Sequence, residues 1–170
     1  MYKKGTREIA YAGIVAALYA VLTIALAPIS YGIYQIRLAE ALTVLPFLFP
    51  SAAIGLWAGC LVANIFGGNG LYDILFGPLF TLAAGSLTYM FSRLKSRRLG
   101  MVLAPIPPII INAFGVAAYL AEITQMNYLF VVQMIGVGQI VACYVLGLPL
   151  LFYLNARGFP RWKESGSITS

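Results

Sequence analysis

Long apolar runs, separated by short polar or basic segments, constrain this chain more than any other feature. Hydrophobic residues make up 61% of its 170 residues and charged residues only 9%, whereas a soluble domain carries about 25% charged residues. An apolar run of about 20 residues crosses a bilayer as a helix, because a helix satisfies its own backbone polar groups in lipid. The sequence therefore predicts an all-α integral membrane protein.

The side chains that support most enzymatic chemistry are scarce. The chain has no His, and its two Cys, Cys60 and Cys143, lie far apart in apolar runs, where we expect them to be buried core residues. It contains no phosphate-binding loop of the GxxxxGK[ST] type and no metal-ligand spacing. We therefore expect a single, non-catalytic transmembrane domain over residues 1–170, with no metal and no cofactor.

The basic residues indicate the topology. Of the 11 Lys and Arg residues, all but Arg37 lie in the lead 1–7, the loop 93–98 or the tail 157–170. The positive-inside rule places these segments on the cytoplasmic side, which requires six spans rather than five and puts both termini in the cytoplasm. The net charge of +6 is thereby explained by topology, and we expect no nucleic-acid partner.

Prolines, glycines and polar residues mark where the spans begin and end. The second span is expected to start near Tyr34 and to be disturbed by Pro46 and Pro50. The other expected spans are about Ile9–Ala27, Ala52–Phe66, Leu71–Phe91, Ile106–Ala121 and Tyr128–Leu154.

The segment Gln35–Pro46 is anomalous in so apolar a chain, because it carries Arg37 and Glu40. Either charge costs about 2.5 to 3.5 kcal/mol at the centre of a membrane helix. Residues three apart on a helix share a face, so Arg37 could simply neutralise Glu40. We interpret Arg37 as the base that orients Glu40 and offsets its charge, and Glu40 as the better candidate for ligand contact.

The predicted topology gathers the polar side chains near the outer face. A small-molecule pocket needs polar groups that converge from several helices at one depth. The alternative is a structural role for each residue, such as a first-turn acid for Asp73 or a turn-satisfying amide for Asn64. The converging residues are Gln35, Arg37, Glu40, Asn64, Asp73, Glu122 and Gln133, with Asn112 and Gln139 somewhat deeper.

Small residues recur at helical spacing in the first span and let another helix backbone approach closely. This stripe could pack inside the chain's own bundle, or it could dock another membrane subunit. It consists of Ala12, Ala16 and Ala20, with Gly13 and Ala17 beside them.

Several of these motifs resemble one known family. They are Tyr31-Gly32, Gln35-Ile-Arg-Leu-Ala-Glu-Ala-Leu-Thr-Val-Leu-Pro46, Ala63-Asn-Ile-Phe-Gly-Gly-Asn-Gly-Leu-Tyr-Asp-Ile-Leu-Phe-Gly77, Asn112-Ala113 and Gly136-Val-Gly-Gln139. Together they are similar to the QueT family, the queuosine-precursor S components of energy-coupling factor transporters, over about residues 8–156. The resemblance implies an S-component-like bundle of six helices in the bacterial plasma membrane. It also implies assembly with an EcfT-like coupling subunit, which docks on the small-residue stripe, and with two cytoplasmic ATPases.

The implied ligand is a 7-deazaguanine base of the cyano, aminomethyl or eukaryotic type, captured from outside. Its lactam N–H and exocyclic amine suit one carboxylate, for which Glu40 and Asp73 are the candidates. The remaining candidates for substrate binding are Asn64, Asn112, Gln139, Arg37, Gln35 and, for stacking, Tyr72. Two other functions stay open: an S component for another small molecule such as a vitamin, and an autonomous secondary transporter.

Overall fold

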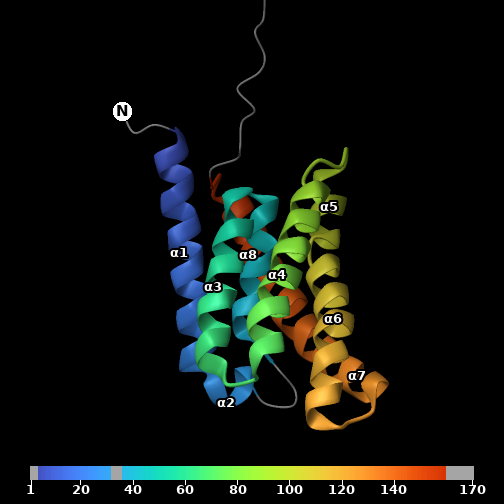
Figure 1. Ribbon diagram of the computed structural model, residues 1–170. Helices are drawn as coiled ribbons and strands as arrows, with labels where there is room; N and C mark the ends of the chain where they lie inside the picture. The colour runs from blue at the N-terminus through green and yellow to red at the C-terminus, as the bar shows by residue number, and fades with distance from the viewer. Residues whose placement is uncertain (1–3, 32–35, 160–170) are drawn as a thin grey trace, which may run out of the picture.

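The computed structural model describes residues 4–31 and 36–159, and this part of the chain is helical without any β-strand. Figure 1 shows α1, α3, α4 and α6 running side by side along one axis. The helices are α1 (Lys4–Ala25), α2 (Ala27–Ser30), the 3₁₀ helix η1 (Leu38–Phe47), α3 (Ser51–Gly67), α4 (Leu71–Phe91), α5 (Arg97–Leu103), α6 (Ile106–Thr124), α7 (Tyr128–Ile140), the π-helical η2 (Val141–Gly147) and α8 (Leu148–Ala156).

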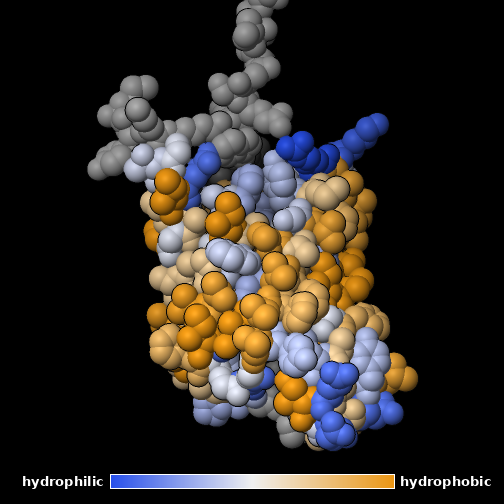
Figure 2. Space-filling model, viewed as in Figure 1, coloured by the Kyte–Doolittle hydropathy of each residue, from blue (hydrophilic) through white to orange (hydrophobic). Residues whose placement is uncertain are grey.

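Four helical stretches in the described part are long and apolar enough to cross a membrane: Gly5–Ala25, Leu71–Phe91, Arg97–Thr124 and Tyr128–Ala156. The third combines α5 with α6, and the fourth combines α7, η2 and α8. Figure 2 shows hydrophobic side chains over the middle of the visible face and hydrophilic ones at both ends. Side chains as apolar as Ile9 and Phe66 are 75% and 71% exposed, which fits a surface that meets lipid.

The expected second span is not a regular α-helix. Leu38–Phe47 forms a 10-residue 3₁₀ helix with Pro46 inside it, and at about 2.0 Å per residue it is about 20 Å long. The hydroxyl of Thr43 donates to the carbonyl oxygen of Glu40 at 2.6 Å, and Pro46 has no N–H for a helical bond. Nearly all of η1 is buried within the bundle.

The two irregular helices, η1 and η2, pack against each other inside the bundle. A Cβ on Gly147 of η2 would lie 2.9 Å from the carbonyl oxygen of Ala41 in η1. The thiol of Cys143, also in η2, lies 3.6 Å from the Thr43 hydroxyl and 3.5 Å from the Glu40 carbonyl oxygen. Both cysteines are buried free thiols, as predicted.

The small-residue stripe of α1 packs partly within the chain. A Cβ on Gly55 of α3 would collide with the carbonyl oxygen of Ala12, and one on Gly59 would lie 2.6 Å from that of Ala16. Ala20 is buried as well. Gly13 and Ala17 are exposed, and a Cβ on Gly13 would meet nothing within 4 Å. Partner docking therefore stays a prediction only for the Gly13 and Ala17 side of α1.

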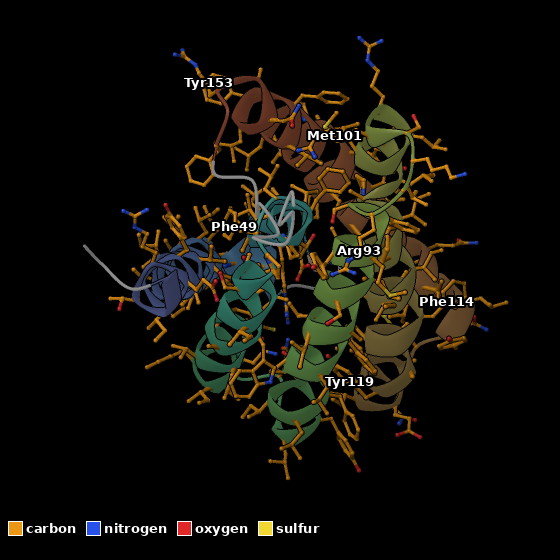
Figure 3. All side chains as sticks on the ribbon, turned by 90° about the horizontal axis from the view of Figure 1, so that it is seen from above. Phe49, Arg93, Met101, Phe114, Tyr119 and Tyr153 are labelled. Atoms are coloured by element: carbon orange, nitrogen blue, oxygen red, sulfur yellow. The ribbon has the colours of Figure 1, made fainter. Side chains whose placement is uncertain are left out.

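Helix α4 lies at the centre of the arrangement. It packs against α3 on one side and α6 on the other, and it also contacts η1. Figure 3 looks along the bundle from the Arg93 end and shows α4 between α3 and α6. Polar residues from these elements can therefore meet around the first turns of α4.

Candidate polar binding site

Glu40 is a buried carboxylate held from two helices. Its side chain is 1% exposed. The hydroxyl of Tyr19, from α1, donates to Oε1 at 2.5 Å, and Nδ2 of Asn112, from α6, donates to Oε2 at 3.1 Å. These two donors, one from α1 and one from α6, fix the orientation of the carboxylate.

Arg37 pairs with Asp73 and not with Glu40. Its NH2 atom lies 3.0 Å from Oδ2 and 3.2 Å from Oδ1 of Asp73, and both side chains are buried. The expected Arg37–Glu40 pairing is wrong, because Arg37 precedes η1 with an extended backbone, at φ −85° and ψ 99°. The two residues therefore do not share a helical face.

The Asp73 carboxylate is fully occupied by protein donors. Besides Arg37, it accepts the hydroxyl of Tyr119 on Oδ1 at 2.6 Å and Nδ2 of Asn69 on Oδ2 at 3.2 Å. Each oxygen thus accepts two hydrogen bonds, which uses the about four acceptor positions of a carboxylate. Glu40 accepts only two hydrogen bonds from the described residues, so it keeps acceptor positions that Asp73 has used.

Asn64 is anchored to the same aspartate through the backbone. Its Nδ2 donates to the main-chain oxygen of Asp73 at 2.6 Å. The close approach depends on Gly77, since a Cβ there would collide with Nδ2 of Asn64 and lie 3.2 Å from Oδ1 of Asp73. Oδ1 of Asn64 and Nε of Arg37 are buried without a hydrogen-bond partner in the described part of the chain.

The guanidinium of Arg37 contacts an aromatic ring in addition to the Asp73 carboxylate. It lies over the ring of Tyr31 at 5.7 Å from the centroid, and the Tyr31 hydroxyl donates to the carbonyl oxygen of Ala63 at 2.6 Å. The Asp73 carboxylate, 3.0 Å from the guanidinium, compensates the positive charge that burial removes from water. Arg37 is thus a buried charge with a partner.

Gln139 lies beside this cluster. Among the described residues, its side chain makes no hydrogen bond to the Glu40 carboxylate. Its Oε1 is 3.6 Å from Sγ of Cys143, whose thiol also faces the Glu40 carbonyl oxygen. Gln35 lies outside the described residues. Of the predicted binding residues, the structure thus brings together Arg37, Glu40, Asn64, Asp73 and Asn112, with Gln139 adjacent.

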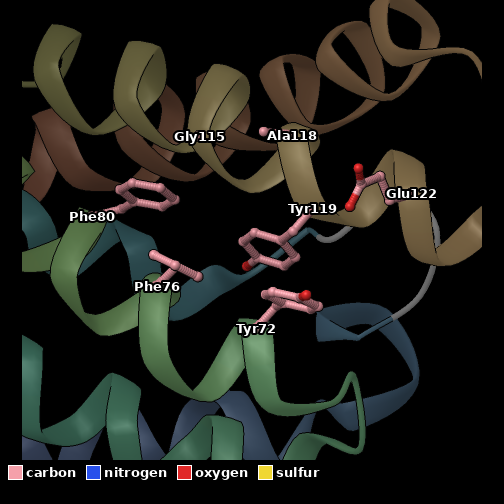
Figure 4. A pocket seen from close by; sticks show the side chains of 7 residues that line it. All are labelled: Tyr72, Phe76, Phe80, Gly115, Ala118, Tyr119 and Glu122. Atoms are coloured by element: carbon pink, nitrogen blue, oxygen red, sulfur yellow. The ribbon is translucent and has the colours of Figure 1, made fainter.

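Tyr72 does not join the cluster. Its side chain is 54% exposed and lines a separate groove of about 270 Å³ between α4 and α6. Figure 4 shows the rings of Tyr72, Phe76 and Phe80 along α4 facing Tyr119, Ala118 and Gly115 of α6, with Glu122 at one end. Tyr119 links the two regions, because its ring lines the groove while its hydroxyl binds Asp73.

Three donors of the cluster were not predicted from the sequence: Tyr19, Asn69 and the hydroxyl of Tyr119. One signal was present, because a Tyr buried in a membrane span needs a partner for its hydroxyl. Tyr19 lies one residue before Ala20 of the small-residue stripe, on the side of α1 that faces α3, where Gly59 makes room for its Cβ.

The chain resembles known proteins over most of its length. The sequence matches the family described as QueT transporter over residues 9–156. The queuosine precursor transporter QueT of Lactococcus lactis subsp. cremoris (strain MG1363) is 37% identical over 98 residues, which are 56% of this chain and 57% of that protein. The matched segment thus spans little more than half of the relative. No solved structure matches the chain. Because the family match covers most of the sequence, the chain belongs to the QueT transporter family.

Proposed function

We propose that this chain is the substrate-binding membrane subunit of an ATP-driven importer for a queuosine precursor, a 7-deazaguanine base taken from the outer face. The observation that carries the proposal is the Glu40 carboxylate, which is buried and oriented by Tyr19 and Asn112 and still has acceptor capacity on both oxygens. A lactam N–H beside an exocyclic amine fits such a carboxylate as a two-point, charge-assisted contact. The printed name of the Lactococcus relative supports the same class of substrate.

The proposed topology is six crossings with both ends in the cytoplasm. Four candidate spans, η1 and α3 would make the crossings. In this proposal η1, which is about 20 Å long, forms one crossing. Its irregular backbone is acceptable there because protein, and not lipid, surrounds it. Lys4, the loop around Arg93 and the end of α8 then share the cytoplasmic side, as the positive-inside rule requires.

Transport in this proposal requires other subunits. The chain contains no phosphate-binding loop, so ATP hydrolysis would come from two cytoplasmic ATPases joined through an EcfT-like coupling subunit. The exposed side of α1, with Gly13 and Ala17, is the proposed contact for that subunit. Small residues at such a surface allow close helix packing in lipid.

Binding and transport separate the proposal from its competitors. Purified chain in detergent should bind 7-deazaguanine by calorimetry without any partner. Liposomes that contain the chain alone should show no uptake, even with an imposed proton or sodium gradient. Gradient-driven uptake by the chain alone would instead establish an autonomous transporter, and absence of binding at micromolar concentrations of 7-deazaguanine would contradict the assigned substrate.

A further inference from the structure

Two polar atoms of the buried cluster remain unused, and they differ in chemistry. Nε of Arg37 can only donate and Oδ1 of Asn64 can only accept. Neither atom has a hydrogen-bond partner in the described part of the chain, and the two side chains are 4% and 1% exposed. Buried polar groups in folded proteins are almost always paired, so each atom points to a missing partner.

Both side chains are fixed by one residue, Asp73. The carboxylate of Asp73 holds the NH2 atom of Arg37, and the main-chain oxygen of Asp73 holds Nδ2 of Asn64. The assignment of the Asn64 amide is constrained, because exchanging its O and N atoms would place two oxygens 2.6 Å apart. Oδ1 is therefore the free atom, and Asp73 itself has no acceptor position left for a ligand.

Hydrogen bonds also connect Glu40, Arg37, Asp73 and Asn64 one after another. The backbone N–H of Glu40 donates to the carbonyl oxygen of Arg37 at 2.9 Å, so these two residues are neighbours. Arg37 then leads to Asp73, and Asp73 leads to Asn64. On a 7-deazaguanine, the ring carbonyl adjoins the lactam N–H, and the N–H of the five-membered ring lies on the far edge. The groups of the base can thus be assigned to Glu40, Arg37 and Asn64 in the order in which these contacts connect the residues.

We propose that Nε of Arg37 donates to the ring carbonyl of the bound base, that Oδ1 of Asn64 accepts the N–H of its five-membered ring, and that Asp73 is the positioning residue for both. This inference rests on the proposed function and deepens it. That ring nitrogen is the one that carries the sugar in a nucleoside, where it has no hydrogen. The site would therefore take the free base and reject the nucleoside, since an unpaired buried acceptor is costly.

The test compares three ligands on the wild-type chain by calorimetry: 7-deazaguanine, its 6-thio analogue and its derivative methylated on the five-membered-ring nitrogen. The thio analogue keeps the lactam N–H and the amine but replaces the carbonyl oxygen with a poor acceptor. We expect each analogue to bind about tenfold more weakly or worse. If the thio analogue binds within about twofold of the parent base, the role of Arg37 is wrong. If the methylated base binds within about twofold, the role of Asn64 is wrong.

Two variants then locate each effect. Arg37→Lys keeps the positive charge but removes Nε, so the thio analogue and the parent base should bind it equally. Asn64→Ala should bind the methylated and parent bases equally. Asp73→Asn should reduce both preferences, whereas a merely structural role would lower thermal stability and leave the ratios unchanged. Preferences that persist in both Arg37→Lys and Asn64→Ala would refute the inference.

The failure of this inference is distinguishable from the failure of the proposed function. If wild type binds 7-deazaguanine tightly but does not discriminate against the analogues, only the roles of Arg37 and Asn64 fall. If wild type does not bind 7-deazaguanine, both the proposed function and this inference are wrong. Should a variant not fold, as judged by size-exclusion chromatography, the ratios measured on wild type still decide.

Discussion

The hydroxyl of Tyr119 donates to Oδ1 of Asp73 at 2.6 Å, while its ring lines the groove between α4 and α6. One side chain therefore belongs both to the buried polar cluster and to the aromatic groove. Its hydroxyl is one of the donors that compensate the buried charge of Asp73.

Removing that hydroxyl should destabilise the protein. Tyr119→Phe keeps the ring but leaves one oxygen of Asp73 with a missing donor, so we expect a loss of about 1 to 3 kcal/mol in the free energy of unfolding. The control is Tyr128→Phe, whose hydroxyl is exposed and makes a longer bond of 3.3 Å to the Phe114 carbonyl oxygen. Chemical denaturation in detergent measures both, and equal effects in the two variants would contradict the role of Tyr119.

The Arg37–Asp73 pair allows a sharper test, because breaking a buried pair costs more than replacing it. Arg37→Met leaves the Asp73 charge unpaired and should lower the free energy of unfolding by about 3 to 5 kcal/mol. The double variant Arg37→Met, Asp73→Leu removes both charges and should recover part of that loss, while the Tyr119 hydroxyl loses its acceptor and keeps the rest. A double variant as unstable as Arg37→Met alone would contradict this account of the pair.

Gly77 should be intolerant of even a methyl group. Gly77→Ala would drive a Cβ into Nδ2 of Asn64 and against Oδ1 of Asp73, so we expect lower stability and weaker ligand binding. Gly136→Ala is the matched control, because the nearest atom to its added Cβ is 3.8 Å away, an ordinary contact. Thermal unfolding and calorimetry of both variants should separate them, and a benign Gly77→Ala would show that Asn64 is not held as described.

The exposed side of α1 is testable through assembly. Gly13→Leu adds a side chain where nothing lies within 4 Å, so the isolated chain should keep its stability and ligand affinity. Co-purification with the EcfT-like coupling subunit should fall sharply if that side docks the partner. Gly59→Leu, which would collide with α1, should instead destabilise the isolated chain. If Gly13→Leu assembles normally with the coupling subunit, the docking surface does not include the Gly13 side of α1.

The sequence was sufficient to predict the helical class and several of the residues that meet in the polar cluster, but Glu122 and Gln133, which were expected to converge with them, are exposed. Periodic apolar runs and basic loops carry that information directly. Contacts now place Arg37, Glu40, Asn64, Asp73 and Asn112 in one cluster, and their role in substrate binding stays a prediction.

The pairing inside the cluster could not be predicted. The Arg37–Glu40 interpretation assumed an α-helix, whereas the chain is extended at Arg37 and forms a 3₁₀ helix after it. Asp73 lies 36 residues from Arg37, and no local periodicity relates two residues so far apart. Likewise, the reach of Tyr19 to Glu40 depends on how closely α1 packs on α3 at Gly59, which is a property of the packed bundle.

The central claim is that Glu40 reads the N–H groups of the base, and it is tested most directly by calorimetry of Glu40→Gln with 7-deazaguanine. Gln keeps the shape but turns one acceptor into a donor, so affinity should fall by about tenfold to a hundredfold. Glu122→Gln makes the same chemical change at an exposed position of α6 and should bind like wild type. If Glu40→Gln binds 7-deazaguanine as tightly as wild type and Glu122→Gln do, the base is not read by Glu40.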